Sequence, residues 1–430
     1  MNTNIFWSEI EDSIVESQAS FASSHFAMAP LKTKAKIKSE TPSRATKKDP
    51  KKFKNKKLSY GSFFSGMDTC LMALRLALRA AFGPCVSAQL QHSFAIDNNP
   101  KVKAFLLANV DPDCVVYGDV RTINLSRLPR VEVVGTHKST YTPYQCCQGP
   151  RVWAEGFQAV WCICTFAVPI EILWYSPPCQ AYSPAGKLEG WTGDGNYNDG
   201  TLVQYPMKYI KKHRPTIAIM ENVPTLKTRF PEVFDTIFHG LECIGKKSYD
   251  VRAMTLNTKE YGLPQHRNRL FIVALAKHAL KTEFFPPAPA PRASLKDMLD
   301  CKLKGKFSTQ PEWLIANIIY AYGKIIKQGG DPFKEMWVAD VRASRKWSPQ
   351  VCDGFCPTIT ASRGGQGGFW VSSLCRFLTV REMGKLQGID MDSIIIPPSV
   401  SEAQLGRMVG NSVSVSVAAL LFGQVFTCLR

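Results

Sequence analysis

A cysteine stands at a rigid corner of this sequence, in the segment WYSPPCQAYSPAGK at 174–187. The apolar residues before it are typical of the end of a buried strand. Pro177 and Pro178 cannot continue a strand ladder, so the chain must leave the sheet there. Cys179 is then either a small apolar core residue or a nucleophile at the carboxyl end of a strand, where open α/β sheets place their sites.

Two further motifs with ionisable side chains lie at predicted strand ends. Glu221 closes the run TIAIMEN, and Arg267 and Arg269 stand in QHRNR at the start of RLFIVALA. A carboxyl group at the end of a buried strand can be held neutral and donate a proton to a ring nitrogen, and two arginines can hold a carbonyl oxygen or phosphates. Each motif also has a plainer interpretation, as a helix-start carboxylate before Pro224 and as a surface arginine pair.

The first part of the chain suits a nucleotide-like cofactor. The turn FSGMD at 64–68 follows a predicted strand and opens a helix, so backbone can approach a ligand there. Asp97 and Asp119 end the next two predicted strands, where a carboxylate can accept hydrogen bonds from a ribose or an amino-purine. A glycine turn after a strand is common, however, and the residues from Asp97 to Pro100 also form a good helix cap.

The order of the predicted elements indicates the scaffold that positions these motifs. From Leu58 onward LSYGSFF, HSFAID and CVVYGD are typical of strands, and helical periodicity lies between them. Strand and helix alternate again after the cysteine corner. This βαβαβ order predicts an α/β fold with a doubly wound, mostly parallel, Rossmann-like sheet.

Composition divides the chain into four parts. Residues 1–57 lack strong periodicity and end in a run, Lys32–Lys57, with twelve basic and two acidic residues, which predicts a disordered leader with a basic tail. The predicted α/β domain spans 58–283. The proline-rich FFPPAPAPRAS begins a small domain at 284–375, and 376–430 returns to a helical pattern.

The formal net charge of +18 most often indicates a polyanionic partner, with nucleic acid as the first expectation. The basic run is interpreted as a nuclear-targeting and DNA-phosphate-binding arm, or as a solubilising leader that no specific partner recognises. No apolar run approaches the roughly 18 residues of a membrane span, so we expect a soluble protein.

Fourteen cysteines without a signal peptide indicate free thiols in a reducing compartment. Four of them, Cys146, Cys147, Cys162 and Cys164, lie in a stretch where strand and helix patterns fade. Their spacing matches no standard zinc pattern, so we predict an insertion loop and no metal.

In their order along the chain, these motifs resemble those of the cytosine-C5 DNA methyltransferase family. FFSGMDT is similar to the family's cofactor loop, SPPCQAYSPAG to its Pro-Cys-Gln motif, ENV to its glutamate motif and QHRNR to its Gln-x-Arg-x-Arg motif. RFLTVREMGKLQGI and GNSVSV are similar to its last two motifs. The resemblance covers nearly all of Leu58–Gln424. The chain departs from the family's pattern at Asp68, where glycine is usual, and in the long stretch between Asp119 and Cys179.

The resemblance implies a class I S-adenosylmethionine-dependent methyltransferase fold with a target recognition domain at 284–375, and double-stranded DNA as the partner. Cys179 would add to C6 of a flipped-out cytosine, while Glu221 would protonate or hydrogen-bond N3 and Asn222 would order the loop. Arg267 and Arg269 would stabilise the ring carbonyl and nearby phosphate charge, with Arg269 on the carbonyl.

The resemblance also implies the binding residues. Phe64 would stack on adenine, Asp97 would bind the ribose and Asp119 the adenine amino group, and Asn411 would orient the acidic residue on the ribose. The expected S-adenosylmethionine residues are Phe64, Ser65, Gly66, Met67, Asp97, Asn98, Asp119, Val120, Pro178, Asn411 and Val413. The expected DNA contacts are Gln180, Ser183, Arg342, Arg345, Lys346 and Arg363, with a flexible loop at Gly364–Gly368.

Two other functions remain open from the sequence. An enzyme of the same fold acting on tRNA would carry the same motifs. A catalytically silent DNA-binding homologue is disfavoured by intact Cys179, Glu221 and Arg269, although Asp68 in the cofactor loop keeps this alternative open.

Overall fold

The structure is a computed structural model, and it describes residues 58–83, 90–125, 128, 171–183, 190, 200–306, 309–342 and 350–430. The predicted leader at 1–57 lies outside these ranges, as do the four clustered cysteines, Arg345 and Lys346.

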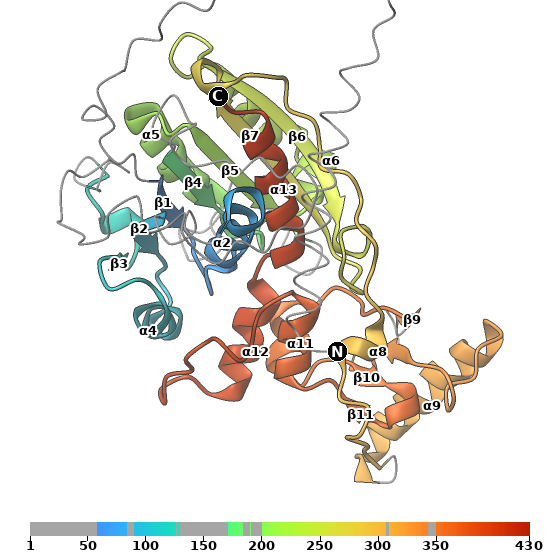
Figure 1. Cartoon of the computed structure of the whole chain (residues 1–430). Coiled ribbons are helices and arrows are strands. Elements are labelled where there is room, and N and C mark those ends of the chain that lie inside the picture. Colours follow the sequence, from blue (N-terminus) through green and yellow to red (C-terminus); the bar gives the residue numbers. More distant parts are fainter. Residues whose placement is uncertain are drawn as a thin grey trace, which may run out of the picture.

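A seven-stranded sheet forms the centre of the larger domain (Figure 1). Its order is β3-β2-β1-β4-β5-β7-β6. The other six strands all run in one direction, and β7 runs in the opposite direction between β5 and β6. The strands are β1 (Leu58–Phe63), β2 (Leu90–Ile96), β3 (Val115–Tyr117), β4 (Glu171–Tyr175), β5 (Ile217–Asn222), β6 (Tyr249–Asn257) and β7 (Asn268–Ala276). The doubly wound, mostly parallel sheet predicted from the βαβαβ order is confirmed.

Helices cover both faces of this sheet because side chains along each central strand alternate between two cores. In β4, Ile172 and Trp174 pack into the core that contains α2 and α13, whereas Leu173 and Tyr175 pack into the core of α5 and α7. The helices of this domain are α2 (Thr69–Phe82), α4 (Pro100–Asn109), α5 (Gln204–His213), α6 (Thr225–Arg229), α7 (Pro231–Glu242) and α13 (Val415–Thr427). The central strands are therefore buried on both sides, as parallel strands usually are.

The small domain is a four-stranded antiparallel sheet with one long helix, at the lower right of Figure 1. Its sheet order is β11-β10-β8-β9. The elements after β7 are α8 (Leu295–Met298), α9 (Glu312–Lys327), β8 (Trp337–Ala339), β9 (Val351–Asp353), α10 (Ala361–Gly365), β10 (Trp370–Val371), β11 (Arg376–Phe377), α11 (Val380–Leu386) and α12 (Glu402–Asn411). Ile318 and Tyr322 of α9 pack with Trp337 and Trp370 in a separate core. Because β11 pairs with β10, the boundary predicted after residue 375 falls inside this sheet.

The C-terminal segment returns to the larger domain, where α13 packs against α2 (Figure 1). Contrary to our expectation, the described residues do contain one helical stretch, Glu402–Thr427, that is long and apolar enough to cross a membrane. Its most apolar window is 89% buried inside the molecule. Core helices of globular proteins share this apolar character, so packing against the sheet accounts for it.

The sheet changes its winding direction between β1 and β4. From β1 the chain proceeds through β2 to the edge strand β3, whereas β4 begins the progression to β5 on the other side. The two strands end level, with Phe63 opposite Tyr175. Ligands of open α/β sheets bind outside the carboxyl ends of the strands at such a switch point. The cofactor loop and the cysteine corner both leave the sheet there.

Candidate active site

The cysteine corner directly follows β4, as predicted. Ser176 donates its backbone N–H to the Phe63 carbonyl at 3.3 Å, which holds β4 to β1 up to its last residue. Beyond the two prolines the loop turns, and Tyr182 N donates to the Cys179 carbonyl at 3.0 Å. Cys179 is only partly buried, so it is not sealed in the core.

Asn222 fastens this loop to the end of β5. Its side-chain amide donates to the Pro177 carbonyl at 3.2 Å, and its amide oxygen accepts the Val223 N–H at 2.8 Å. Asn222 is 1% exposed, and in such an environment these hydrogen bonds are protected from competing water. The loop that carries Cys179 is thereby held beside Glu221, the preceding residue in β5.

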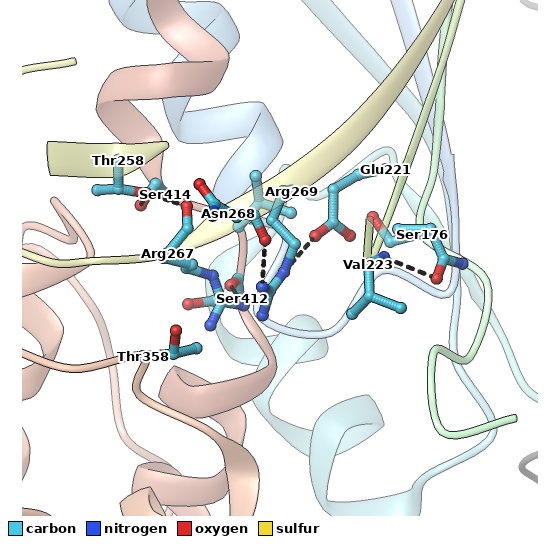
Figure 2. Close-up of polar contacts among 12 residues, drawn as sticks. Ser176, Glu221, Val223, Thr258, Arg267, Asn268, Arg269, Thr358, Ser412 and Ser414 are labelled. Carbon is cyan, nitrogen blue, oxygen red and sulfur yellow. Dashed lines mark hydrogen bonds and ion pairs between the residues drawn. The ribbon is translucent and has the colours of Figure 1, made fainter. Parts of the chain in front are cut away.

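Glu221 and Arg269 form an ion pair between β5 and β7. Arg269 Nε lies 3.0 Å from Glu221 Oε1, and the two side chains point toward one another in Figure 2. Arg269 also donates through Nη1 to the Asn268 carbonyl at 2.7 Å. Both side chains are only slightly exposed, at 10% and 15%. The sequence predicted a carboxyl group at the end of a buried strand, and the structure places a guanidinium beside it.

These two charges act on the thiol of Cys179. Burial raises the pKa of Cys179, the positive charge of Arg269 lowers it, and Glu221 raises it. The hydrogen bond from Asn222 to the Pro177 carbonyl holds the Cys179 loop beside the end of β5, where Glu221 pairs with Arg269. A thiol, a carboxyl group and a guanidinium that can stabilise an anion thus lie at one edge of the sheet.

The guanidinium of Arg267 forms hydrogen bonds inside the protein. Its guanidinium donates to the carbonyls of Ile359 at 2.7 Å, Gly410 at 3.3 Å and Ser412 at 2.6 Å, and the residue is 2% exposed. Figure 2 shows it beside Ser412. A side chain engaged by three buried carbonyls holds the C-terminal segment in place, and its predicted contact with a ring carbonyl or phosphate stays a prediction.

The cofactor loop has an unusual backbone. Phe64, Gly66 and Asp68 all adopt left-handed conformations, with φ of 57°, 54° and 51°. A side-chain carbon added to Gly66 would meet no atom within 4 Å, so packing does not demand a glycine there. Gly66 N donates to Asp97 Oδ2 at 3.0 Å, which ties the loop to the end of β2. A ligand can therefore approach the backbone of the loop at Gly66, beside the Phe64 ring and the Asp97 carboxylate. This arrangement fits an adenosine-bearing cofactor.

Asp68 occupies the position where the family usually has glycine, and its side chain turns into the protein. It accepts the Tyr60 hydroxyl at 2.7 Å and the Ser62 hydroxyl at 3.4 Å, and His92 Nε2 lies 3.2 Å from its Oδ2. Asp tolerates the left-handed conformation better than most residues. Burial raises the pKa of Asp68 and lowers that of His92. Where glycine would leave the backbone free, the Asp68 side chain therefore holds the loop through its contacts with Tyr60, Ser62 and His92.

The C-terminal segment reaches the cofactor loop through Thr69. Thr69 Oγ1 donates to the Val413 carbonyl at 3.0 Å, and Val413 N lies 3.2 Å from the same oxygen. Val413 therefore lies beside the loop, as predicted. Asn411 differs from the prediction, because it is exposed and Asp97 is held by the backbone N–H groups of Gly66 and Asn99 instead.

Four further predicted cofactor residues lie in the loop or just after β3. Ser65 accepts the Ile96 N–H at 3.0 Å and thus shapes the loop, and Met67 and Val120 are buried, with Val120 at the start of a short 3₁₀ turn. Asp119 does not present an unengaged carboxylate for an adenine amino group, since Arg121 pairs with it at 2.5 Å. That ion pair lowers the pKa of Asp119.

Three predicted contacts surround the nucleophile in the described part of its loop. Pro178, Gln180 and Ser183 are all partly buried. Gln180 Oε1 is buried and accepts no hydrogen bond within the described residues. A carbonyl oxygen in that state offers an acceptor to an incoming ligand.

Two of the predicted DNA-contacting arginines of the small domain, Arg342 and Arg363, have contacts within it. Arg342 lies over the Phe377 ring, 4.8 Å from its centroid, and Arg363 Nε donates to Asp340 Oδ2 at 2.8 Å. The expected flexible loop at 364–368 is wrong in its first half, because Gly364 belongs to α10 and a side chain there would overlap the Gly406 carbonyl of α12. Close helix contact, and not mobility, requires that glycine.

Sequence reasoning missed the polar residues that join the motifs to each other. Thr258 Oγ1 lies 2.8 Å from Ser414 Oγ, and Gln265 donates to Gln387 Oε1 at 3.1 Å. These contacts link the arginine motif to the last two motifs across more than a hundred residues. Polar residues inside otherwise apolar stretches were the available indication, but their partners are set by tertiary structure alone.

This fold and site define an α/β enzyme with a cysteine loop beside a nucleotide-type cofactor loop. A model of the family described as "C-5 cytosine-specific DNA methylase" matches residues 161–427. The match covers more than half of the chain, and the chain belongs to this family of DNA cytosine-C5 methyltransferases.

Individual relatives agree with this membership. The chain is 30% identical to the type II methyltransferase M.HaeII of Haemophilus aegyptius over 265 residues, 60% of this chain and 75% of the relative. It is 28% identical to M.NgoBI of Neisseria gonorrhoeae over 57% of this chain and 71% of the relative. Among solved structures, the Entamoeba histolytica methyltransferase EhMeth matches with a TM-score of 0.53 and 17% identity, over 86% of this chain and 98% of that one. That structural match supports the fold.

Proposed function

We propose that this chain methylates C5 of a cytosine flipped out of double-stranded DNA, through a covalent bond between the Cys179 sulfur and C6 of the ring. The position of the Cys179 loop beside the Glu221–Arg269 ion pair supports this assignment most directly. C5 of cytosine is a poor nucleophile, and addition of a thiolate to C6 moves electron density onto it.

Each of the three side chains has a distinct task in this reaction. The Cys179 thiolate forms the bond to C6, and the carboxyl group of Glu221 donates a proton or a hydrogen bond to N3 as electron density rises in the ring. Arg269 stabilises the thiolate before attack and the ring carbonyl during it. Once C5 has taken the methyl group, a base removes the C5 proton and the C6–sulfur bond breaks, which restores the aromatic ring and the free thiolate of Cys179.

S-adenosylmethionine is the cofactor that we propose for the loop at 64–68, and when bound it supplies the methyl group. Phe64 offers a ring to the adenine, and Asp97 offers a carboxylate to the ribose hydroxyls. Val413 closes the site from the C-terminal side through its contact with Thr69. Asp119 would have to exchange Arg121 for an adenine amino group, so we leave it out of the binding set.

Double-stranded DNA is the proposed partner. A base inside a duplex must be extruded to reach the thiol, at a cost of a few kcal/mol. The net charge of +18 supplies favourable, sequence-independent attraction to phosphates that offsets this cost.

A nuclear location is also proposed, and it rests on the basic run at 32–57 alone. A fluorescent fusion that lost nuclear accumulation when residues 32–57 were deleted would support it, and unchanged distribution would contradict it.

Methyl transfer to duplex DNA tests the proposal and separates it from its alternatives. The full chain is incubated with radiolabelled S-adenosylmethionine and either duplex DNA or tRNA. Label in 5-methylcytosine of DNA is expected. Label in tRNA alone would favour the RNA enzyme, and calorimetry without cofactor binding would favour the silent homologue.

A further inference from the structure

A pocket of about 360 Å³ lies between the two domains, outside the group of Cys179, Glu221 and Arg269. The larger domain contributes Lys259 and His266, and the small domain contributes Lys324 and Gln328 from the end of α9 with Cys352 and Phe355 around β9. None of the described residues that line it is acidic. The pocket therefore combines positive charge and amide groups, a combination suited to an anion.

Phe355 gives this pocket a rigid aromatic wall. Lys259 Nζ lies 5.7 Å from the centroid of its ring, and Arg292 Cζ also lies 5.7 Å from it. The His266 ring is 6.4 Å away at a tilt of 66°. Cation–π attraction of this kind holds both cations over one ring, so Lys259 is oriented at the pocket instead of moving freely in solvent.

One residue that lines the pocket, His266, belongs to the arginine motif. His266 immediately precedes Arg267 in the chain, and its backbone N–H donates to the Cys356 carbonyl at 2.8 Å. Its carbonyl accepts the Thr358 hydroxyl at 2.7 Å. An anion bound between Lys259 and Lys324 would therefore bridge the two domains close to the segment that carries Arg267 and Arg269.

We propose that this pocket binds a backbone phosphate of the DNA duplex and thereby sets the position of the small domain relative to the active site. The identity of the partner rests on the proposed function. The chemistry rests on the pocket itself, where two lysines from separate domains and the Gln328 amide surround a space without a carboxylate in its described lining.

Duplex binding by the full chain at several salt concentrations tests this assignment, with an unmodified oligonucleotide duplex and fluorescence anisotropy as the readout. Each phosphate contact contributes about 0.9 to the slope of log affinity against log salt concentration. We expect Lys259→Gln and Lys324→Gln each to weaken binding and to reduce the slope by up to about 0.9, and the double variant by no more than about 0.9, because the pocket holds one phosphate. Lys327→Gln is the matched control, because it removes the same charge from an exposed position on the same helix.

The proposal is overturned if the two pocket variants match Lys327→Gln in affinity and slope. Circular dichroism melting of each variant confirms that the folded state is being compared. Failure of the pocket and failure of the proposed function are distinguishable. Methyl transfer with unaltered slopes rejects only the pocket, whereas altered slopes in a chain without methyl transfer reject only the activity.

Discussion

Arg269 Nε lies 3.0 Å from Glu221 Oε1, across the antiparallel pair of β5 and β7. The pairing depends on β7 being inserted antiparallel beside β5, which brings the start of β7 to the edge where β5 ends. That edge also carries the Cys179 loop, held through Asn222 and Pro177. One strand reversal thus places the arginine motif beside the nucleophile.

Glu221→Gln is expected to lower kcat by about 10²- to 10⁴-fold, the usual contribution of a positioned acid or base. The amide keeps the shape of the side chain but loses the charge that pairs with Arg269. Steady-state methyl transfer measures the effect. Glu283→Gln, which breaks the exposed pair with Arg252, is the control and should leave kcat unchanged. Equal rates for the two variants would remove Glu221 from the mechanism.

The rate of methyl transfer in a single turnover should rise with pH from about 7 to about 9, where cysteine thiols begin to ionise. Burial raises the pKa of Cys179, so the thiolate fraction is small at neutral pH and increases as pH approaches that raised value. Arg269 lowers the pKa. Arg269→Gln should therefore displace the profile to higher pH, and alkylation of Cys179 by iodoacetamide should follow the same displacement. A profile independent of pH would contradict this account.

Arg267→Met is expected to reduce the free energy of unfolding by about 3 kcal/mol or more, since three buried carbonyls lose a charged donor. Arg252→Met is the comparison, because Arg252 is 45% exposed and surface pairs contribute at most about 1 kcal/mol. Urea unfolding compares the two. If Arg267→Met matched Arg252→Met in stability yet lost activity, the catalytic role first predicted for Arg267 would be restored.

Asp68→Asn should retain wild-type cofactor affinity and stability, because asparagine tolerates the left-handed backbone and still accepts from Tyr60. Asp68→Ala should lose about 1–3 kcal/mol of stability, since the buried Tyr60 hydroxyl is left without its acceptor. Asp68→Gly separates the two causes by restoring backbone freedom without the acceptor. Thermal melting and calorimetry of S-adenosylmethionine binding report the results, and a stable Asp68→Ala with unchanged affinity would show that the anchor has no effect.

The strands, helices and motifs of the larger domain were predictable because they depend on local patterns. Apolar periodicity located β1, β4 and β5, and two prolines located the corner at Cys179. The reversal of β7 has no local pattern of its own, so the Glu221–Arg269 ion pair emerged only with the tertiary structure.

The roles of individual polar residues were harder to predict. Arg267 and Arg269 are two residues apart in one motif, yet one binds buried carbonyls and the other faces Glu221. Sequence spacing places them on the same side of a strand, and only the surrounding elements decide what each contacts. The same applies to Asp119, whose partner Arg121 is two residues away.

The most direct test of the central claim is covalent trapping by duplex DNA that carries 5-fluorocytosine at target positions, with S-adenosylmethionine present. Fluorine at C5 cannot leave as a proton does, so the enzyme should remain bonded to the base. The account predicts a denaturation-resistant protein–DNA adduct for the full chain, located by peptide mass spectrometry on Cys179, and none for Cys179→Ala. An adduct of equal yield with Cys179→Ala would contradict it.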